Sequence, residues 1–151
     1  MSDKIILLVE DNPDDQLLTQ RALKKYHIPN RVVIATDGAE ALDYLFREGI
    51  HSSRRIEDNP YVVLLDLKLP KIDGLQVLEK LRGDSRTQRL PVVVLTSSTQ
   101  QSDIESAYRL GANSYLRKSV DSDEFYETVG HLGLYWLKLN INSPVPRMGV
   151  L

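Results

Sequence analysis

A carboxylate directly follows an unbroken apolar run near the middle of the chain. The run Val62–Leu65 leads into Asp66 with no polar residue between them. A stretch that is apolar at every position is typical of a strand covered on both faces, as in a parallel sheet. An ionised carboxylate at the end of such a strand is costly to bury unless a partner neutralises it. The pattern therefore predicts a partner for Asp66 elsewhere in the chain.

Other side chains that could do chemistry stand at the ends of other predicted strands: Glu10 and Asp11, Thr96, and Lys118. The carboxyl ends of parallel strands meet at one edge of a sheet, so we expect these groups to converge with Asp66. Three crowded carboxylates repel one another unless a cation lies among them. An all-oxygen set with few carboxylates suits Mg²⁺, which keeps several of its waters, with Mn²⁺ or Ca²⁺ as substitutes.

Each of these residues also has an ordinary structural explanation. Glu10, Asp11 and Asp14 would suit the positive end of a following helix. Thr96 fits the β-propensity of threonine, and Lys118 could be a surface lysine. These explanations do not account for the occurrence of all the groups at equivalent strand ends, so the joint pattern favours a functional site.

Strand-like and helix-like stretches alternate along the chain. Strands are predicted at 4–10, 31–36, 62–66, 90–98 and 113–118, and helices follow each of them. Helix starts are indicated by Asn12 with Pro13, and by the spaced pairs Asp37 and Glu40, Ser102 and Glu105, and Asp121 and Glu124. The alternation predicts an α/β fold: a doubly wound, five-stranded parallel sheet, flavodoxin-like with strand order 2-1-3-4-5 and helices on both faces.

Length and composition limit the class of protein. The 151 residues suit one domain, and the net charge of −2 does not indicate a nucleic-acid partner. The chain contains no cysteine, which excludes disulfides and thiolate metal sites. The apolar run 5–9 is too short for a signal peptide or a membrane span. We therefore expect a cytoplasmic protein with no membrane partner.

Further residues complete an ordered pattern around the strand ends: Pro70 and Gly74 after Asp66, then Thr96, Gly111-Ala112, Tyr115 and Lys118. In this order the sequence resembles the receiver domain of two-component response regulators, over about residues 3–138. It is most similar to the single-domain regulators that partner cyanobacterial phytochromes, because Ser119 follows Lys118 and "YWL" ends the last helix. The resemblance implies a receiver at 3–139 and a tail at 140–151 without an effector domain.

The resemblance also implies roles for individual residues. Asp66 would accept a phosphoryl group from a phosphohistidine on a sensor histidine kinase such as a phytochrome. Asp11 would bind Mg²⁺ directly, Glu10 directly or through water, and the backbone carbonyl of Lys68 would complete the ligands. Such a protein is a signalling phosphoprotein rather than an enzyme, although it catalyses its own phosphorylation and slow dephosphorylation.

The remaining implied roles concern the response to phosphorylation. Thr96 would hydrogen-bond the phosphoryl group, Lys118 would pair with its oxygens, and Tyr115 would change rotamer as Thr96 moves. The sequence departs from most receivers at Ser119, where proline is usual, often after a cis peptide bond. A cis bond without proline costs about 3–4 kcal/mol, so the loop is either strained or trans.

Other functions remain open at this level. A flavin-binding, flavodoxin-like protein shares the fold but needs a phosphate-cradling loop after the first strand, where this chain has "VEDNPDDQ". A phosphohydrolase of the haloacid-dehalogenase type would need a second acid at position 68, which is Lys68. A receiver-like adaptor that is never phosphorylated is a third alternative.

The last helix predicts self-association. Phe125, Val129, Leu132 and Trp136 form one helical stripe that should pack on the sheet. Five apolar side chains lie off this stripe: Tyr126, Leu134, Tyr135, Leu137 and Leu139. They indicate either a second apolar face, with Tyr126, Leu134 and Leu137 as the expected contact residues, or an unusually broad buried face under the tail. Because such faces often mark protein contacts, and because the similar phytochrome-partner regulators dimerise in this region, we expect a homodimer through this helix and the preceding strand.

Overall fold

The computed structural model describes residues 4–144. Its strands are β1 (Ile5–Val9), β2 (Val32–Ala35), β3 (Pro60–Leu65), β4 (Val92–Thr96) and β5 (Ser114–Arg117). Its α-helices are α1 (Pro13–Lys25), α2 (Gly38–Phe46), α3 (Gly74–Arg82), α4 (Gln101–Arg109) and α5 (Ser122–Leu134). Short 3₁₀ turns at Gly49–His51 and Ile56–Asp58 occupy the long connection between α2 and β3.

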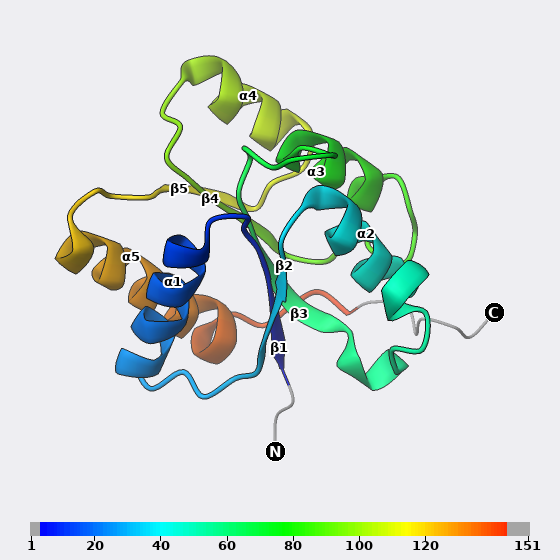
Figure 1. Ribbon diagram of the computed structural model, residues 1–151, viewed down its shortest axis with the longest axis horizontal. Coiled ribbons are helices and arrows are strands. Elements are labelled where there is room, and N and C mark those ends of the chain that lie inside the picture. The colour runs from blue at the N-terminus through cyan, green and yellow to red at the C-terminus, as the bar shows by residue number, and fades with distance from the viewer. Residues whose placement is uncertain (1–3, 145–151) are drawn as a thin grey trace.

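The five strands form one sheet in the order β2-β1-β3-β4-β5, and every neighbouring pair is parallel (Figure 1). This confirms the predicted α/β fold and its strand order. In the central pair, Val9 lies opposite Leu65. The residues that follow these two strands, Glu10 and Asp66, therefore leave the sheet side by side.

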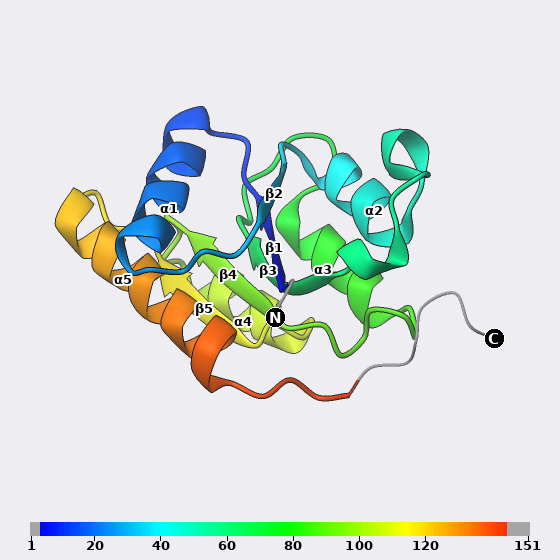
Figure 2. The same ribbon diagram turned by 90° about the horizontal axis from the view of Figure 1, so that it is seen from below.

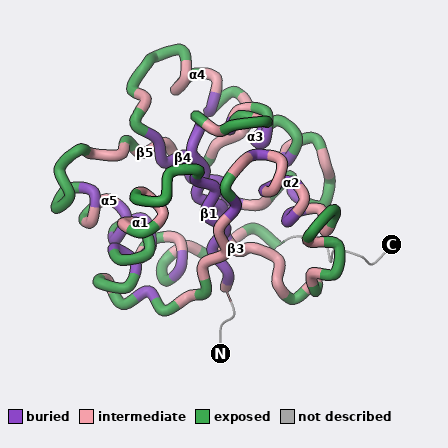
Figure 3. Tube along the Cα trace, viewed as in Figure 1, coloured by how far each residue is buried: buried purple, intermediate pink, exposed green. Residues whose placement is uncertain are grey.

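Two helix layers cover the sheet. Helices α1 and α5 lie together on one face, and α2, α3 and α4 lie on the other (Figures 1 and 2). Successive strand residues point to opposite faces. Accordingly, Ile6 and Leu8 belong to the cluster with α1 and α5, whereas Leu7 and Val9 belong to the cluster with α2 and α3. Figure 3 shows β1, β3 and β4 as the buried centre of the molecule, which explains their apolar sequences, whereas the edge strands β2 and β5 are mostly of intermediate burial.

Local side-chain caps set most helix starts where the sequence predicts them. Asn12 accepts hydrogen bonds from the backbone N–H groups of Asp14 and Asp15, with Pro13 at the first helical position. Asp37 and Asp121 likewise accept from the N–H groups three residues further on. These caps satisfy backbone donors that have no partner within the helix. Helix α3 has a full capping box between Asp73 and Gln76, which the sequence analysis did not single out.

The predicted start of the fourth helix at Ser102 is wrong. Helix α4 begins at Gln101, after Gln100. Ser98, in the loop before the helix, makes the local hydrogen bonds instead. Its Oγ accepts from the N–H of Gln100 at 3.3 Å and donates to Asp103 at 2.5 Å. Ser102 therefore lies within the first turn of the helix rather than before it.

The final helix reaches Leu139 as expected, but it changes geometry after Leu134. Residues Tyr135–Leu139 form a π-helical turn. A π turn holds an extra residue, so side chains five apart, rather than four, share a face. Phe125, Val129 and Leu132 pack in the core as predicted, and Leu137 joins them with 4% of its surface exposed.

The assignment of Leu137 to an exposed second face is therefore wrong. Tyr126 and Leu134 are partly buried against the same core cluster, as is Trp136. The exposed apolar side chains at this end of the molecule are Tyr135, Leu139 and Ile141, with exposures of 49%, 71% and 92%.

After the π turn, residues 140–144 run along the amino ends of the central strands (Figure 2). Asn142 donates to the carbonyl of Tyr61 at the start of β3, and Arg89 donates to the carbonyl of Pro144, each at 3.0 Å. The rest of the predicted tail, 145–151, lies outside the described residues. Across 4–144, no helix combines the length and the apolar character that crossing a membrane requires.

Candidate phosphoacceptor site

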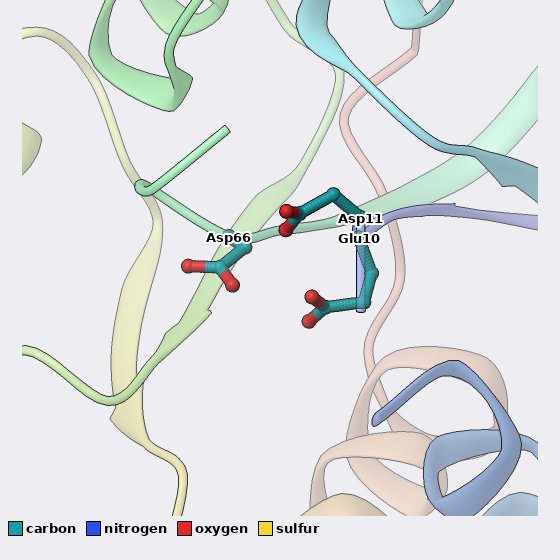
Figure 4. Close-up of side chains that lie close together, drawn as sticks. All are labelled: Glu10, Asp11 and Asp66. Atoms are coloured by element: carbon teal, nitrogen blue, oxygen red, sulfur yellow. The ribbon is translucent and has the colours of Figure 1, made fainter. Parts of the chain in front are cut away.

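The three predicted carboxylates meet at the carboxyl edge of the sheet. Oxygens of Glu10, Asp11 and Asp66 all lie within 4.8 Å of one another. Figure 4 shows Glu10 and Asp11 reaching from the end of β1 toward Asp66, which stands at the end of β3. Glu10 and Asp66 are buried, whereas Asp11 is exposed. The parallel pairing of β1 and β3 thus produces the cluster that the sequence predicts.

Lys118 is the main cationic partner of this cluster. Its Nζ lies 2.8 Å from Asp66 Oδ2 and 2.5 Å from Glu10 Oε1. A third carboxylate, Asp15 Oδ2, lies 2.9 Å away. The backbone of Lys118 is fixed by its N–H, which donates to the carbonyl of Thr96 at 2.7 Å. The peptide bond to Ser119 is trans, since the described residues include no cis peptide bond.

Thr96 holds the other oxygen of Asp66. Its hydroxyl donates to Asp66 Oδ1 at 2.9 Å, and the backbone N–H of Lys68 donates to the same oxygen at 3.2 Å. Thr96 is fully buried at the end of β4, and Asp66 is 7% exposed. The buried carboxylate therefore has the partners that its burial requires: both oxygens of Asp66 have donors, and one donor is an ammonium.

Burial and charge oppose each other at this site. Burial raises the pKa of Glu10 to about 7, although the hydrogen bond from Lys118 partly offsets this effect. For Lys118, burial alone would lower the pKa. Its hydrogen bonds to Asp66, Glu10 and Asp15 outweigh burial and hold the pKa above its usual value. The ammonium form of Lys118 is thus strongly favoured.

A polar network extends from the site toward β5. The Tyr115 hydroxyl donates to the carbonyl of Ser98 at 3.0 Å, in the loop that follows Thr96. Burial raises the pKa of Tyr115, so this hydroxyl stays protonated as a donor. The Lys68 ammonium lies 3.5 Å from Asp103 on α4. Of the predicted switch residues, Thr96 therefore directly precedes the loop between β4 and α4, and Tyr115 binds that loop at Ser98.

Gly74 brings helix α3 close to the site. A Cβ at this position would lie 2.3 Å from the carbonyl oxygen of Asp66 and 2.6 Å from the Cα of Leu67. Since real Cβ atoms do not approach backbone this closely, a residue with a side chain would displace either α3 or the end of β3. Gly74 therefore sets the position of the backbone that carries Asp66.

The cluster is chemically suited to a hard divalent cation. Glu10, Asp11 and Asp66 supply carboxylate oxygens within reach of one another, and oxygen is the donor that Mg²⁺ and Mn²⁺ prefer. The exposure of Asp11 leaves room for the waters that Mg²⁺ retains. The role of the Lys68 backbone carbonyl as a ligand stays a prediction.

Sequence reasoning missed Asp15 and Asp103. Both lie in the first turn of a helix, where acidic residues are common because of the helix dipole, so their sequence positions do not distinguish them. Asp14 and Asp15 are identical in type, and only the rotation of α1 about its axis brings Asp15, and not its exposed neighbour, to Lys118.

The family is now clear. Residues 6–130 match the model of the response regulator receiver domain. The chain therefore belongs to the response-regulator receiver family, as its sequence pattern predicted, and it is a signalling receiver-domain protein.

Several relatives match over nearly their whole length. The chain is 43% identical over 143 residues to the probable methanogenesis regulatory protein FilR2 of Methanothrix harundinacea, covering 94% of this chain and 88% of the relative. It is 37% identical over 135 residues to the response regulator Rcp1 of Synechocystis, covering 89% and 90%.

Solved structures agree with these relatives. The phosphorylated cyanobacterial phytochrome response regulator RcpA superposes with a TM-score of 0.88 at 38% identity, covering 95% of this chain and all of that one. The Mn²⁺-bound form of Rcp1 superposes with a TM-score of 0.86 at 35% identity, covering 93% and 99%. The predicted likeness to phytochrome response regulators is thus confirmed.

Proposed function

We propose that residues 3–139 form a phosphoacceptor domain that takes a phosphoryl group onto Asp66 from a sensor histidine kinase, in a Mg²⁺-dependent reaction in the cytoplasm. The observation that carries this proposal is the placement of Asp66. Its two oxygens are held by Thr96 and Lys118, and its carboxylate lies beside Glu10 and Asp11. A carboxylate so positioned is a competent nucleophile for phosphoryl transfer.

The reaction would form one bond and break another. An Asp66 carboxylate oxygen bonds to phosphorus as the phosphorus–nitrogen bond to the kinase histidine breaks, and the electron pair leaves with the imidazole. Lys118 can then pair with a phosphoryl oxygen, and Thr96 can donate its hydroxyl to another. Positioning and charge neutralisation supply most of the catalysis in such transfers.

Glu10, Asp11 and Asp66, with the Lys68 carbonyl, would hold the Mg²⁺. When bound, the ion would neutralise the charge of the phosphoryl oxygens. The Mn²⁺-bound structure of the relative Rcp1 supports a divalent ion in this family.

The upstream partner in this proposal is a phytochrome-type histidine kinase. RcpA is a cyanobacterial phytochrome response regulator and is similar to this chain along almost its full length. FilR2, a probable methanogenesis regulatory protein of an archaeon, is at least as similar in sequence. Phosphotransfer from a panel of purified histidine kinases, some of them phytochromes and some not, would decide whether the upstream kinase is a phytochrome. Transfer only from other kinases would reject the phytochrome partner.

The first prediction tests the acceptor itself. Asp66→Asn removes the nucleophilic carboxylate with little change in shape, so it should abolish phosphorylation by acetyl phosphate while the circular dichroism spectrum stays unchanged. Intact-mass spectrometry would detect the adduct. Asp123→Asn, in the exposed first turn of α5, is the matched control and should be phosphorylated normally. An undiminished adduct in Asp66→Asn would reject the assignment, and no adduct on the wild type would favour the adaptor alternative.

A further inference from the structure

The Lys118 ammonium is bound by three carboxylates that differ in their other roles. An ammonium has three N–H donors, and here they serve Glu10, Asp66 and Asp15, at 2.5, 2.8 and 2.9 Å. Glu10 and Asp66 also belong to the proposed metal cluster. Asp15 does not belong to it, so its bond to Lys118 does not compete with metal binding.

The backbone of Asp15 is held firmly by its surroundings. Its N–H donates to the Asn12 side chain at 3.1 Å, and its carbonyl accepts from the Thr19 hydroxyl at 2.8 Å. The Asp15 side chain is 30% exposed, more than that of Glu10 or Asp66, at 4% and 9%. Its carboxylate therefore approaches the ammonium from the outer side of the site.

We propose that Asp15 is a positioning residue that keeps the Lys118 ammonium beside Asp66 during phosphoryl transfer. The inference rests on the proposed function. A cation beside Glu10 and Asp66, or a phosphoryl group on Asp66, takes up carboxylate charge that otherwise holds Lys118, so each such change weakens a partner of Lys118. A lysine side chain has four flexible bonds and loses considerable entropy when fixed. Asp15 is the partner that stays, because neither the cation nor the phosphoryl group requires it.

The test compares two neighbouring aspartates in the same helical turn. Asp15→Asn should lower the maximal rate of phosphorylation by acetyl phosphate, at saturating Mg²⁺ and donor, by about five- to tenfold. Asp15→Glu keeps a carboxylate of greater reach and should restore most of the rate. Asp14→Asn makes the same charge change at an exposed position and should react like the wild type.

A second measurement uses the protein without metal or phosphodonor. In excess chelator, an amine-specific acylating reagent followed by peptide mass spectrometry would report the reactivity of Lys118, whose side chain is 10% exposed. Asp15→Asn should raise its rate of modification about threefold. Asp14→Asn should leave that rate unchanged, and unchanged modification of Lys80 would serve as an internal reference.

The outcomes separate this inference from the proposed function. Equal phosphorylation rates for Asp15→Asn and the wild type would overturn the role of Asp15. An equal loss of rate in Asp14→Asn would also overturn it, since the loss would then be a general effect of removing a negative charge. If the wild type itself accepts no phosphoryl group, the proposed function fails. The labelling measurement then still decides whether Asp15 fixes Lys118.

Discussion

At the scale of single residues, the two oxygens of Asp66 are held by donors of different kinds. Oδ1 receives neutral donors, Thr96 and a backbone N–H, whereas Oδ2 receives the ammonium of Lys118. All three bonds end on the ionised carboxylate, and hydrogen bonds that involve a charged group are roughly twice as strong as neutral ones. The carboxylate is therefore fixed in orientation before any phosphodonor arrives, which reduces the reorganisation that the reaction requires.

Metal dependence is the second prediction and belongs to this scale. Chelation with EDTA should stop phosphorylation of the wild type, because three carboxylates around one ammonium leave negative charge that repels a phosphodonor. Asp11→Ala should weaken Mg²⁺ binding by at least about tenfold, measured by calorimetric titration. Asp14→Asn is the control for charge loss next to the site. An unchanged phosphorylation rate in chelator would contradict the site as described.

The convergence of Glu10, Asp66, Thr96 and Lys118 could be predicted because it depends only on strand order and strand ends. The contact of Asp15 with Lys118 could not, because it depends on the rotation of α1 and on the lysine rotamer. Neither the rotation of α1 nor the rotamer of Lys118 produces a periodic pattern in the sequence. Spacing predicts which elements bring residues to one edge, and packing decides which of two adjacent side chains makes the contact.

At the scale of elements, α1 and α5 pack unusually closely. A Cβ on Gly130 of α5 would lie 2.3–2.4 Å from ring atoms of Tyr26, which directly follows α1. One on Gly133 would lie 2.9 Å from Leu23. The absence of side chains at these two positions lets the helices approach. One face of the sheet is therefore covered by a helix pair whose spacing depends on two glycines.

The third prediction follows from this packing. Gly130→Ala should lower the free energy of unfolding by about 1–3 kcal/mol, since the aromatic ring or the helix must shift to admit the methyl group. Urea denaturation followed by circular dichroism would measure it. Gly83→Ala is the matched control, because a Cβ there would lie 3.5 Å from the carbonyl oxygen of Glu79, an ordinary contact, and the φ angle of −86° suits any residue. Equal stability of the two variants would contradict the close approach.

Arg82 gives the fourth prediction. From the end of α3 its guanidinium donates to the carbonyls of Thr87, Leu90 and Gly111, and to the side chain of Asn113. These contacts join the connections before β4 and β5. Arg82→Met keeps the apolar stem but leaves these oxygens without the charged donor, so stability should fall by about 2–4 kcal/mol. Lys80→Met on the exposed face of α3 should change stability little, and a similar fall in both would reject the role of Arg82.

Helix caps were the most predictable feature of the elements, because Asn12, Asp37 and Asp121 act on backbone within three residues. The start of α4 was predicted incorrectly, since the helix begins at Gln101 without a side-chain cap, and Ser98 in the preceding loop makes the local bonds to Gln100 and Asp103. The π turn was not predicted either. It follows from tertiary packing, which brings Leu137 into the core at the expense of regular helical spacing.

At the scale of the whole molecule, self-association remains a proposal, and the structure changes which residues would test it. Charged substitution of the buried Leu137 would disrupt the core and report on folding rather than on a contact. Tyr135 and Leu139 are the exposed apolar side chains of the π turn. We infer that a homodimer through α5 and β5 would bury these two residues with the partly exposed Tyr126 and Leu134.

The fifth prediction is therefore a dimer in the absence of phosphate. Light scattering should give the dimer mass for the wild type at tens of micromolar, and the monomer mass for Tyr135→Glu combined with Leu139→Glu. Ile50→Glu, at a 78% exposed apolar position in the connection between α2 and β3, should remain dimeric. A monomeric wild type, or a dimer that survives the double substitution, would contradict the proposed interface.

The path of residues 140–144 determines how the protein can be attached to other materials. These residues are bound to Tyr61 and Arg89 at the amino edge of the sheet, and Asp66 stands at the carboxyl edge. A fluorescent reporter or a biosensor surface joined directly after Pro144 would approach from the side opposite the reacting carboxylate. Anchoring by this end should leave Asp66 open to solution.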